Sequence, residues 1–111
     1  MALIRTHTIK QGDNGPIYKV KIKDIDVDAC TCQQSVMSED LSTEEMAAAS
    51  VTLTTVHNSV EYFQVYLNPT QTALLAAGTY VWVIQIDRAT PEPVLAQERH
   101  FGLIVETQGL T

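Results

Sequence analysis

Apolar and polar residues alternate most clearly in the segment Ile17–Lys23, where three apolar residues are each followed by a lysine. Side chains of a strand point alternately to opposite faces, so this spacing predicts a strand with one buried and one exposed face. The segment Ile4–Lys10 is rich in Thr and Ile, and residues 11–16 that follow it are typical of a turn. We therefore expect these two segments to be paired strands.

Five further segments carry strand-like patterns: Cys30–Met37, Val51–Val56, Val60–Leu67, Gly78–Ile86 and Val94–Glu106. The short turn His57–Ser59 predicts that the second and third of these form a hairpin. The most continuous apolar run, Val81–Ile86, predicts a central core strand, and the last strand is expected to be interrupted near Gly102. The total of about seven strands separated by turns predicts an all-β sandwich of antiparallel strands.

Two segments interrupt this alternation. Residues 38–49 are first acidic and then rich in Ala, and Ser42–Glu45 has the form of a capping box, which predicts one or two helical turns in a connecting loop. Arg88–Pro93 holds two prolines, which cannot donate hydrogen bonds to a neighbouring strand, so we expect a turn there.

The run Asp24–Asp28 alternates acidic with aliphatic residues, which invites comparison with a calcium-binding loop. An EF-hand loop needs Gly at its sixth position and Glu at its twelfth, and these positions hold Ala29 and Ser35. We therefore expect a solvent-exposed connection in which Ile25 and Val27 are tucked inward.

The composition is that of one globular domain covering residues 1–111, with 45% apolar and 18% charged residues. The formal charge of −6 repels phosphate backbones and disfavours nucleic acid as a partner. No apolar stretch approaches the roughly 20 residues that span a bilayer. The first residues also lack the pattern of a signal peptide, so we expect a soluble chain that is not exported.

Candidate chemistry is sparse, and each motif has a plain structural reading. The lysines at 19, 21 and 23 would share one strand face, as a solvated edge or as a docking patch. Cys30 and Cys32 are too far apart for easy disulfide geometry and lack the paired spacing of a zinc site, so we expect reduced, partly buried thiols, with an intermolecular disulfide as the alternative. His7, His57 and His100 are expected to be surface or capping residues. We predict no catalytic, cofactor-binding or metal-binding residues and no cofactor.

The aromatic residues suggest a fold signature. Leu74–Tyr80 has the form of a tyrosine corner, in which a Leu packs inward, a Gly permits the bend and Tyr80 bonds back to the backbone. Antibody domains place a cysteine two residues later, where this chain has Trp82. These features predict an immunoglobulin-like sandwich held by packing alone.

Four short motifs occur in order over nearly the whole chain: Gln11–Asp13, Val36–Met37, Val60–Tyr62 and Ala77–Tyr80. In this order they resemble the immunoglobulin-like N-terminal domain of the tailed-phage baseplate upper protein family and related small phage virion proteins. Two turns depart from that pattern, at Asn58–Ser59, where the family usually has Gly, and at Thr90–Pro93, where Asp-Gly would be usual. The chain also stops at Thr111, whereas a baseplate upper protein continues into a stalk.

The resemblance implies a non-enzymatic structural protein of the bacteriophage virion, assembled in the host cytoplasm. It would act as a protein–protein interaction module of the tail, baseplate or neck, in a multicopy symmetric assembly with other virion structural proteins and without nucleic acid or membrane. A capsid decoration protein is one alternative. Another is a cellular carbohydrate-binding or adhesion sandwich with an aromatic platform drawn from Tyr18, Tyr62, Phe63, Tyr66 and Trp82, although core packing is the simpler account of Tyr62, Tyr66 and Trp82. For assembly we expect unused sheet edges at residues 2–8 and 103–110.

Overall fold

A computed structural model describes residues 3–88 and 94–107, with the side chains of 94–96 left aside. It contains eight strands, one short 3-10 helix and one short α-helix. The strands are β1 (Thr6–Lys10), β2 (Tyr18–Val20), β3 (Cys30–Ser38), β4 (Glu44–Val51), β5 (Thr54–His57), β6 (Val60–Val65), β7 (Gly78–Arg88) and β8 (Val94–Glu106). The helices are η1 (Val27–Ala29) and α1 (Pro69–Ala73). Among the described residues, no helix is long and apolar enough to cross a membrane.

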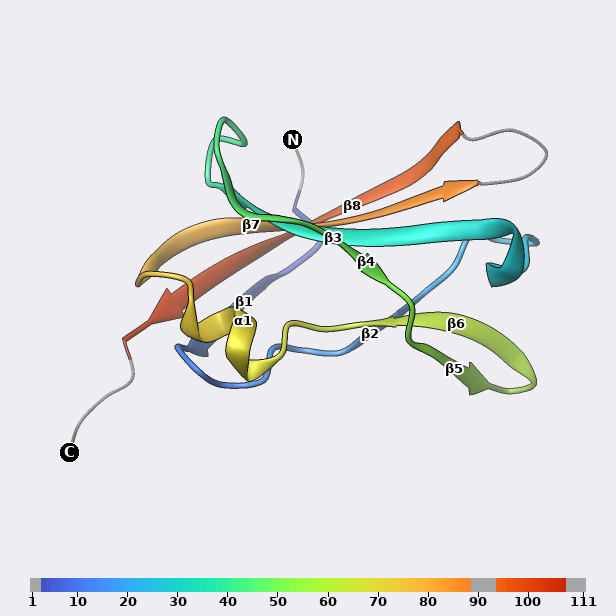
Figure 1. Cartoon of the computed structure of the whole chain (residues 1–111), viewed down its shortest axis with the longest axis horizontal. Helices are drawn as coiled ribbons and strands as arrows, with labels where there is room; N and C mark the ends of the chain where they lie inside the picture. Colours follow the sequence, from blue (N-terminus) through green and yellow to red (C-terminus); the bar gives the residue numbers. More distant parts are fainter. Residues whose placement is uncertain (1–2, 89–93, 108–111) are drawn as a thin grey trace.

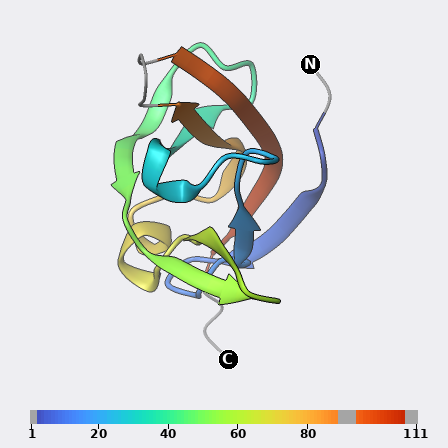
Figure 2. The ribbon, with the colours of Figure 1, turned by 90° about the vertical axis from the view of Figure 1, so that its right-hand side faces the viewer.

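The strands form two packed sheets, as the alternation of apolar residues predicts. The larger sheet has the order β1-β8-β7-β3-β4, and the smaller has the order β2-β6-β5. In Figure 1 strands β3, β4 and β7 of the larger sheet lie above the smaller sheet, whereas β1 and the end of β8 descend to the lower left; Figure 2 shows the sandwich from one end. The sandwich prediction is therefore confirmed.

The strand order is that of an immunoglobulin domain. Such a domain places strands B, E and D in one sheet and C, F and G in the other. Here β2, β6 and β5 occupy the first three positions, and β3, β7 and β8 occupy the other three. Strand β4 extends the larger sheet beyond β3, as C′ does in variable-type domains.

The core lies between the sheets, and its centre is strand β7. Trp82, Ile84 and Ile86 point inward from β7 and are essentially inaccessible. Phe101 on β8 packs beside Trp82, with ring centroids 5.5 Å apart. The prediction that residues 78–86 form the central core strand is confirmed.

The tyrosine corner is present. The Tyr80 hydroxyl donates to the carbonyl oxygen of Ala76 at 2.5 Å, and Leu75 is buried beneath it. Leu74 points outward instead, with 80% of its surface exposed. Burial raises the pKa of Tyr80, and the nearby charge of Glu45 adds to the effect. The corner therefore fixes the entry into β7 as the sequence predicts.

Several local predictions are wrong. The first two strands do not pair: β1 runs parallel to β8 in the larger sheet, whereas β2 pairs with β6 in the smaller sheet. The strand expected over Ile17–Lys23 covers only Tyr18–Val20. Strand β8 also continues through Gly102 without interruption. The missing side chain of Gly102 lets β1 approach closely, because a Cβ there would lie 2.5 Å from Thr6 Oγ1.

The helical turns expected at Ser42–Glu45 are absent, because strand β4 already begins at Glu44 and pairs with β3. The preceding turn is organised by Asp40, which accepts hydrogen bonds from Ser38 and Ser42. These bonds lower the pKa of Asp40 to about 2. The α-helix lies instead at α1, where Asn68 and Gln71 form a reciprocal capping box and Pro69 occupies the first turn.

The hairpin predicted around His57–Ser59 is confirmed, with β5 and β6 joined by Asn58 and Ser59. Both turn residues have positive φ, 52° and 66°. Consecutive positive φ values match the twist of a tight hairpin, and such turns favour Asn, Asp or Gly at the first position and Gly at the second. The second turn noted in the sequence, Thr90–Pro93, lies outside the described residues.

Candidate functional site

A hydrogen-bonded chain through the core joins the two sheets. The indole nitrogen of Trp82 donates to Gln34 Oε1 at 2.8 Å, and Gln34 Nε2 donates to the Tyr66 carbonyl oxygen at 3.0 Å. Gln34 is only 7% exposed, and both its side-chain oxygen and its side-chain nitrogen have a hydrogen-bond partner, as a buried carboxamide requires. The sequence alone did not predict this role of Gln34.

The two cysteines lie on the inner face of β3 and line an open cleft of about 380 Å³ between the sheets. Both are free thiols; Cys32 is buried and Cys30 half-buried. Burial raises the pKa of Cys32 to about 12 and also raises that of Cys30. At neutral pH both are therefore protonated and weakly nucleophilic. Their reduced state in solution stays a prediction, which intact mass would test.

The three histidines do not come together. His7 is half-buried in β1, bonds to the Tyr18 hydroxyl across the sandwich and packs near Phe101. Burial, and secondarily the charge of Arg5, lower the pKa of His7. His57 ends β5 and is exposed, and His100 lies within β8 in contact with Glu98. The expectation of surface or capping roles is thus wrong for His7, which is a packing residue.

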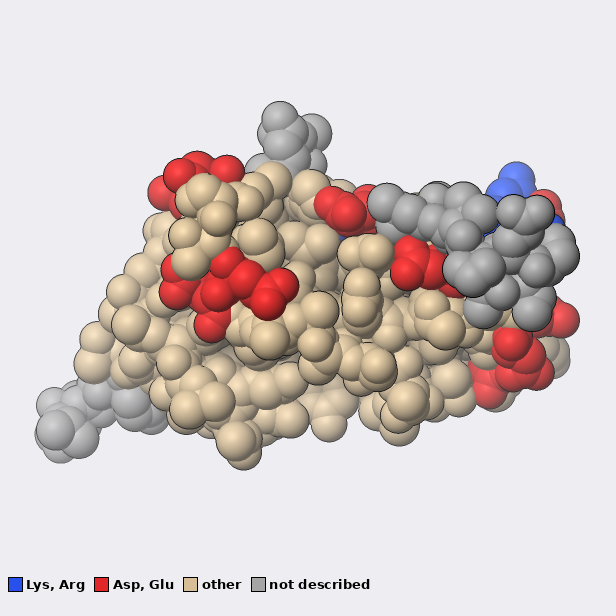
Figure 3. All heavy atoms as spheres, turned by 45° about the horizontal axis from the view of Figure 1, so that its top comes forward, with Lys and Arg blue, Asp and Glu red and all other residues tan. Residues whose placement is uncertain are grey.

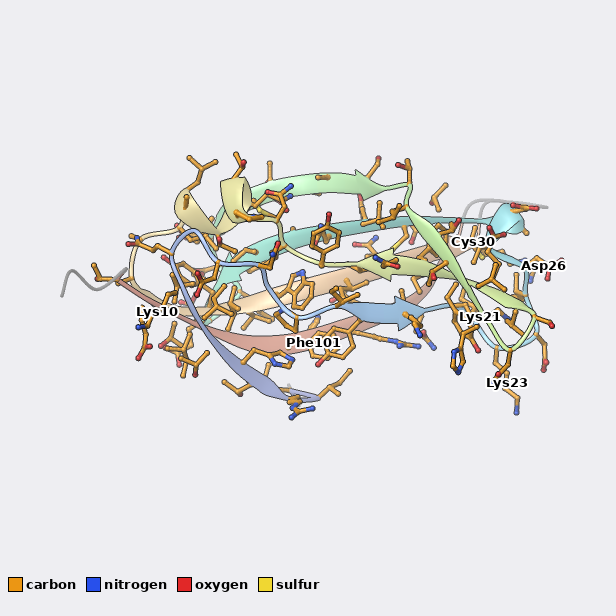
Figure 4. All side chains as sticks on the ribbon, turned by 90° about the horizontal axis from the view of Figure 1, so that it is seen from below. Lys10, Lys21, Lys23, Asp26, Cys30 and Phe101 are labelled. Carbon is orange, nitrogen blue, oxygen red and sulfur yellow. The ribbon has the colours of Figure 1, made fainter. Side chains whose placement is uncertain are left out.

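The lysines do not share a strand face, because β2 ends before Lys21. Lys19 and Lys23 are exposed, whereas Lys21 is half-buried and donates to the carbonyl oxygen of Ile22. Figure 4 shows Lys21 and Lys23 at the end of the molecule that also carries Asp26, with Lys10 at the other end. A continuous basic docking patch is therefore not formed there.

The acidic segment 24–28 is a solvent-exposed connection, as predicted. Asp24, Asp26 and Asp28 are exposed, whereas Val27 is buried and Ile25 is half-buried. Across the described residues, no group of three or more His, Cys, Asp or Glu side chains is placed to hold a metal ion.

The proposed aromatic platform divides between core and surface. Trp82 and Phe63 are buried, and Tyr18 packs on Phe101 with ring centroids 4.3 Å apart. Tyr62 and Tyr66 are half-buried and alternate with buried Phe63 and Val65, so they lie on the outer face of the smaller sheet. The expectation that Tyr62 and Tyr66 pack in the core is therefore wrong.

A shallow pocket of about 220 Å³ lies where the end of β4 passes the segment between β6 and α1. Its lining includes four carboxamide side chains, those of Gln34, Gln64, Asn68 and Gln71. We call this site the amide pocket. The amide pocket could not be predicted from the sequence, because its residues come from three segments that only the fold brings together.

Each sheet has two open edges among the described residues: β1 and β4 in the larger sheet, β2 and β5 in the smaller. Strand β8 is not an edge, because Leu103 aligns with His7 of β1 on one side and Tyr80 of β7 on the other. The expected edge at residues 103–110 is thus wrong for its described part. The edge expected at residues 2–8 is confirmed where it overlaps β1, at residues 6–8.

Exposed acidic side chains cluster at the β3–β4 turn and at the start of β4. Glu39, Asp40, Glu44 and Glu45 are all exposed. Figure 3 shows acidic groups spread over the face in view, with Lys and Arg visible only at one end. The sequence has no Lys or Arg between Lys23 and Arg88, so this region repels anionic partners.

In comparisons with known proteins, no family model matches the chain, and no curated protein matches it.

Proposed function

We propose that this protein is a structural component of a tailed-phage virion, where it acts as a protein–protein interaction module of the tail, baseplate or neck. The immunoglobulin-like strand order and the tyrosine corner are compatible with the family that the sequence motifs resemble. A non-catalytic role agrees with protonated thiols at Cys30 and Cys32 and with a His7 ring engaged by Tyr18.

The observation that carries the proposal is the open edge of β1. Of the four edges, β2 and β5 are only three and four residues long. Strand β4 is longer, but its pairing with β3 contains register shifts, and bulges disfavour edge pairing. Strand β1 pairs with β8 in unbroken register over five residues.

The segment that leads into β1 adds apolar surface to this edge. Leu3 and Ile4 are 43% and 60% exposed, although the Ile4 N–H is anchored to the His100 carbonyl oxygen. An ordered, exposed apolar segment beside an unpaired edge is a template for a strand of a neighbouring chain. In a symmetric particle, repeated weak contacts of this kind add to stable attachment.

The backbone register supplies a variant that separates assembly from folding. Gly102 donates its N–H to the Arg5 carbonyl oxygen, and Thr6 aligns with Gly102. Because alternate residues of a strand direct their backbone groups to opposite edges, the N–H of Thr8 faces away from β8. Thr8→Pro therefore removes a hydrogen-bond donor only from the open edge.

The test is tandem mass spectrometry of purified particles from a phage that carries this coding sequence. We expect the wild-type chain and a His57→Ala control in multiple copies per particle, and loss of Thr8→Pro from particles. Thermal melts of the isolated Thr8→Pro protein should stay close to wild type. Particles that lack the wild-type chain would overturn the virion assignment, and normal incorporation of Thr8→Pro would overturn the role of the β1 edge.

A further inference from the structure

The amide pocket is lined only by uncharged residues. These are Gln34, Ser50, Val51, Thr52, Leu53, Gln64, Tyr66, Asn68 and Gln71. Carboxamides both donate and accept hydrogen bonds, and a tyrosine ring adds an apolar face with a polar tip. The pocket therefore offers many hydrogen bonds without a charge to pair with an ion.

Two of these carboxamides are held in fixed orientation by the capping box of α1. The Gln71 backbone N–H donates to Asn68 Oδ1, and the Asn68 backbone N–H donates to Gln71 Oε1, each at 2.8 Å. Because both side-chain oxygens are used, the NH₂ groups of Asn68 and Gln71 are the groups left to donate to a ligand. Their conformations are set before any ligand binds, which lowers the entropic cost of binding.

The floor of the pocket is equally fixed. Gln34 is held between the Trp82 indole and the Tyr66 carbonyl oxygen, so it supports the site but has little left to offer a ligand. Gln64 is different: its backbone N–H donates to the Leu53 carbonyl oxygen, but its side chain has no hydrogen-bond partner within the described residues. Gln64 thus supplies both a donor and an acceptor to the pocket.

We propose that the amide pocket binds a neutral oligosaccharide. Sugar hydroxyls match paired amide donors and acceptors, and the apolar face of a sugar ring fits against the half-buried ring of Tyr66. An ionic ligand would lose its hydration without gaining an opposite charge, which is unfavourable. The volume of about 220 Å³ lies below the roughly 300–1,000 Å³ of pockets that enclose drug-sized molecules, so one ring of a longer chain would enter.

The site goes beyond the proposed assembly role and does not depend on it. It lies on the side of the sandwich formed by β4, β6 and α1, whereas the assembly edge is β1 at the opposite end of the larger sheet. An assembled module would therefore keep the amide pocket available to a glycan.

The test begins with the intact protein on a printed array of neutral and acidic oligosaccharides. The strongest neutral binder is then titrated into ¹⁵N-labelled protein. We expect saturable shifts of the backbone amides of Gln64, Asn68 and Gln71. Loss of one hydrogen-bonding or stacking group, in Gln64→Ala or Tyr66→Ala, should weaken binding about tenfold.

Two control variants replace a tyrosine and a glutamine that lie outside the amide pocket. Tyr62→Ala removes a tyrosine from the same outer face but outside the pocket, and Gln33→Ala removes a carboxamide from the other sheet; both should bind like wild type. Absence of any neutral binder, a preference for acidic glycans, or equal losses in Tyr62→Ala and Tyr66→Ala would overturn the proposal. None of these results would bear on the presence of the chain in particles.

Discussion

Trp82 occupies the position at which an antibody domain carries its second cysteine, two residues after the corner tyrosine. A disulfide would tie strand F to strand B, whereas this protein uses hydrogen bonds that run from β7 through Gln34 of β3 to the backbone of Tyr66. The link still crosses between the two sheets, because Tyr66 directly follows β6. The side chain of Gln34 therefore links the two sheets by hydrogen bonds, where an antibody domain links them by a disulfide.

Replacing this carboxamide tests its role. Gln34→Leu keeps a similar volume but leaves both the Trp82 indole N–H and the Tyr66 carbonyl oxygen buried without their partner. Each unsatisfied buried group costs about 1–3 kcal/mol, so we expect a loss of about 2–4 kcal/mol in the free energy of unfolding. Urea denaturation measures it. The neighbouring control Gln33→Leu, on the outer face, should lose less than about 1 kcal/mol; equal losses would show that the bridge contributes little.

At the scale of elements, the β5–β6 hairpin stores strain in its turn. Ser59 has φ of 66°, a conformation that costs a residue with a Cβ about 1–2 kcal/mol relative to the right-handed region. Glycine adopts it without that cost but gives the unfolded chain more freedom, which offsets part of the gain.

We therefore expect Ser59→Gly to stabilise the protein by about 0.5–1 kcal/mol in chemical denaturation. Ser42→Gly is the matched control, because Ser42 also lies in a turn between strands but donates its hydroxyl to Asp40. That control should destabilise. A loss of stability in Ser59→Gly would mean that the Ser59 side chain contributes more than the strained backbone costs.

The alternation of apolar residues was enough to predict most strands, because burial of one strand face requires an apolar residue at every second position, which is visible within a few residues. Pairing was harder to predict. Strand β1 pairs with β8, which lies more than ninety positions away in the sequence, and not with the adjacent β2. Likewise, Ser42–Glu45 and Asn68–Gln71 carry similar local capping signals, but pairing with β3 overrides the first, whereas Pro69 supports the second.

The candidate sites also differ in how much of each could be predicted from the sequence. The sequence indicated that Cys30 and Cys32 share a face, since i and i+2 residues of a strand always do. The amide pocket could not be foreseen, because Gln34, Gln64 and Gln71 are brought together only when the sheets pack. The spacing of Tyr62 and Tyr66 puts both on one face of a strand, but periodicity alone did not say which face is buried.

At the scale of the whole molecule, His7 joins the two sheets on the side opposite the amide pocket. It lies in β1 of the larger sheet and bonds to Tyr18 of β2 in the smaller sheet, next to Phe101. In the view of Figure 4, Phe101 lies between the ribbons of β1 and β2. Protonation of the His7 ring is therefore coupled to the contact between the edge strands β1 and β2.

The pH dependence of stability follows from the direction of the pKa shift. Burial, with a contribution from Arg5, lowers the pKa of His7 below the ordinary value of 6.5, so the folded protein favours the neutral ring. The unfolded chain takes up a proton as the pH falls below about 6.5, and the folded chain does so only at lower pH. The stability that His7 contributes is thus present above pH 6.5 and is lost as the medium is acidified.

We expect urea midpoints to fall between pH 7.5 and 5.0 in the wild-type protein and to fall less in His7→Gln. Asp40 does not contribute to the change in stability between pH 7.5 and 5.0, because its ordinary pKa of 3.8 is lowered to about 2. Its contribution to stability is lost only under more acidic conditions. The control His57→Gln changes an exposed histidine at the end of β5 and should keep the wild-type pH dependence. If His57→Gln flattens the profile and His7→Gln does not, the edge contact between β1 and β2 is insensitive to the charge of His7, and the acid sensitivity of the sandwich arises in the β5–β6 hairpin instead.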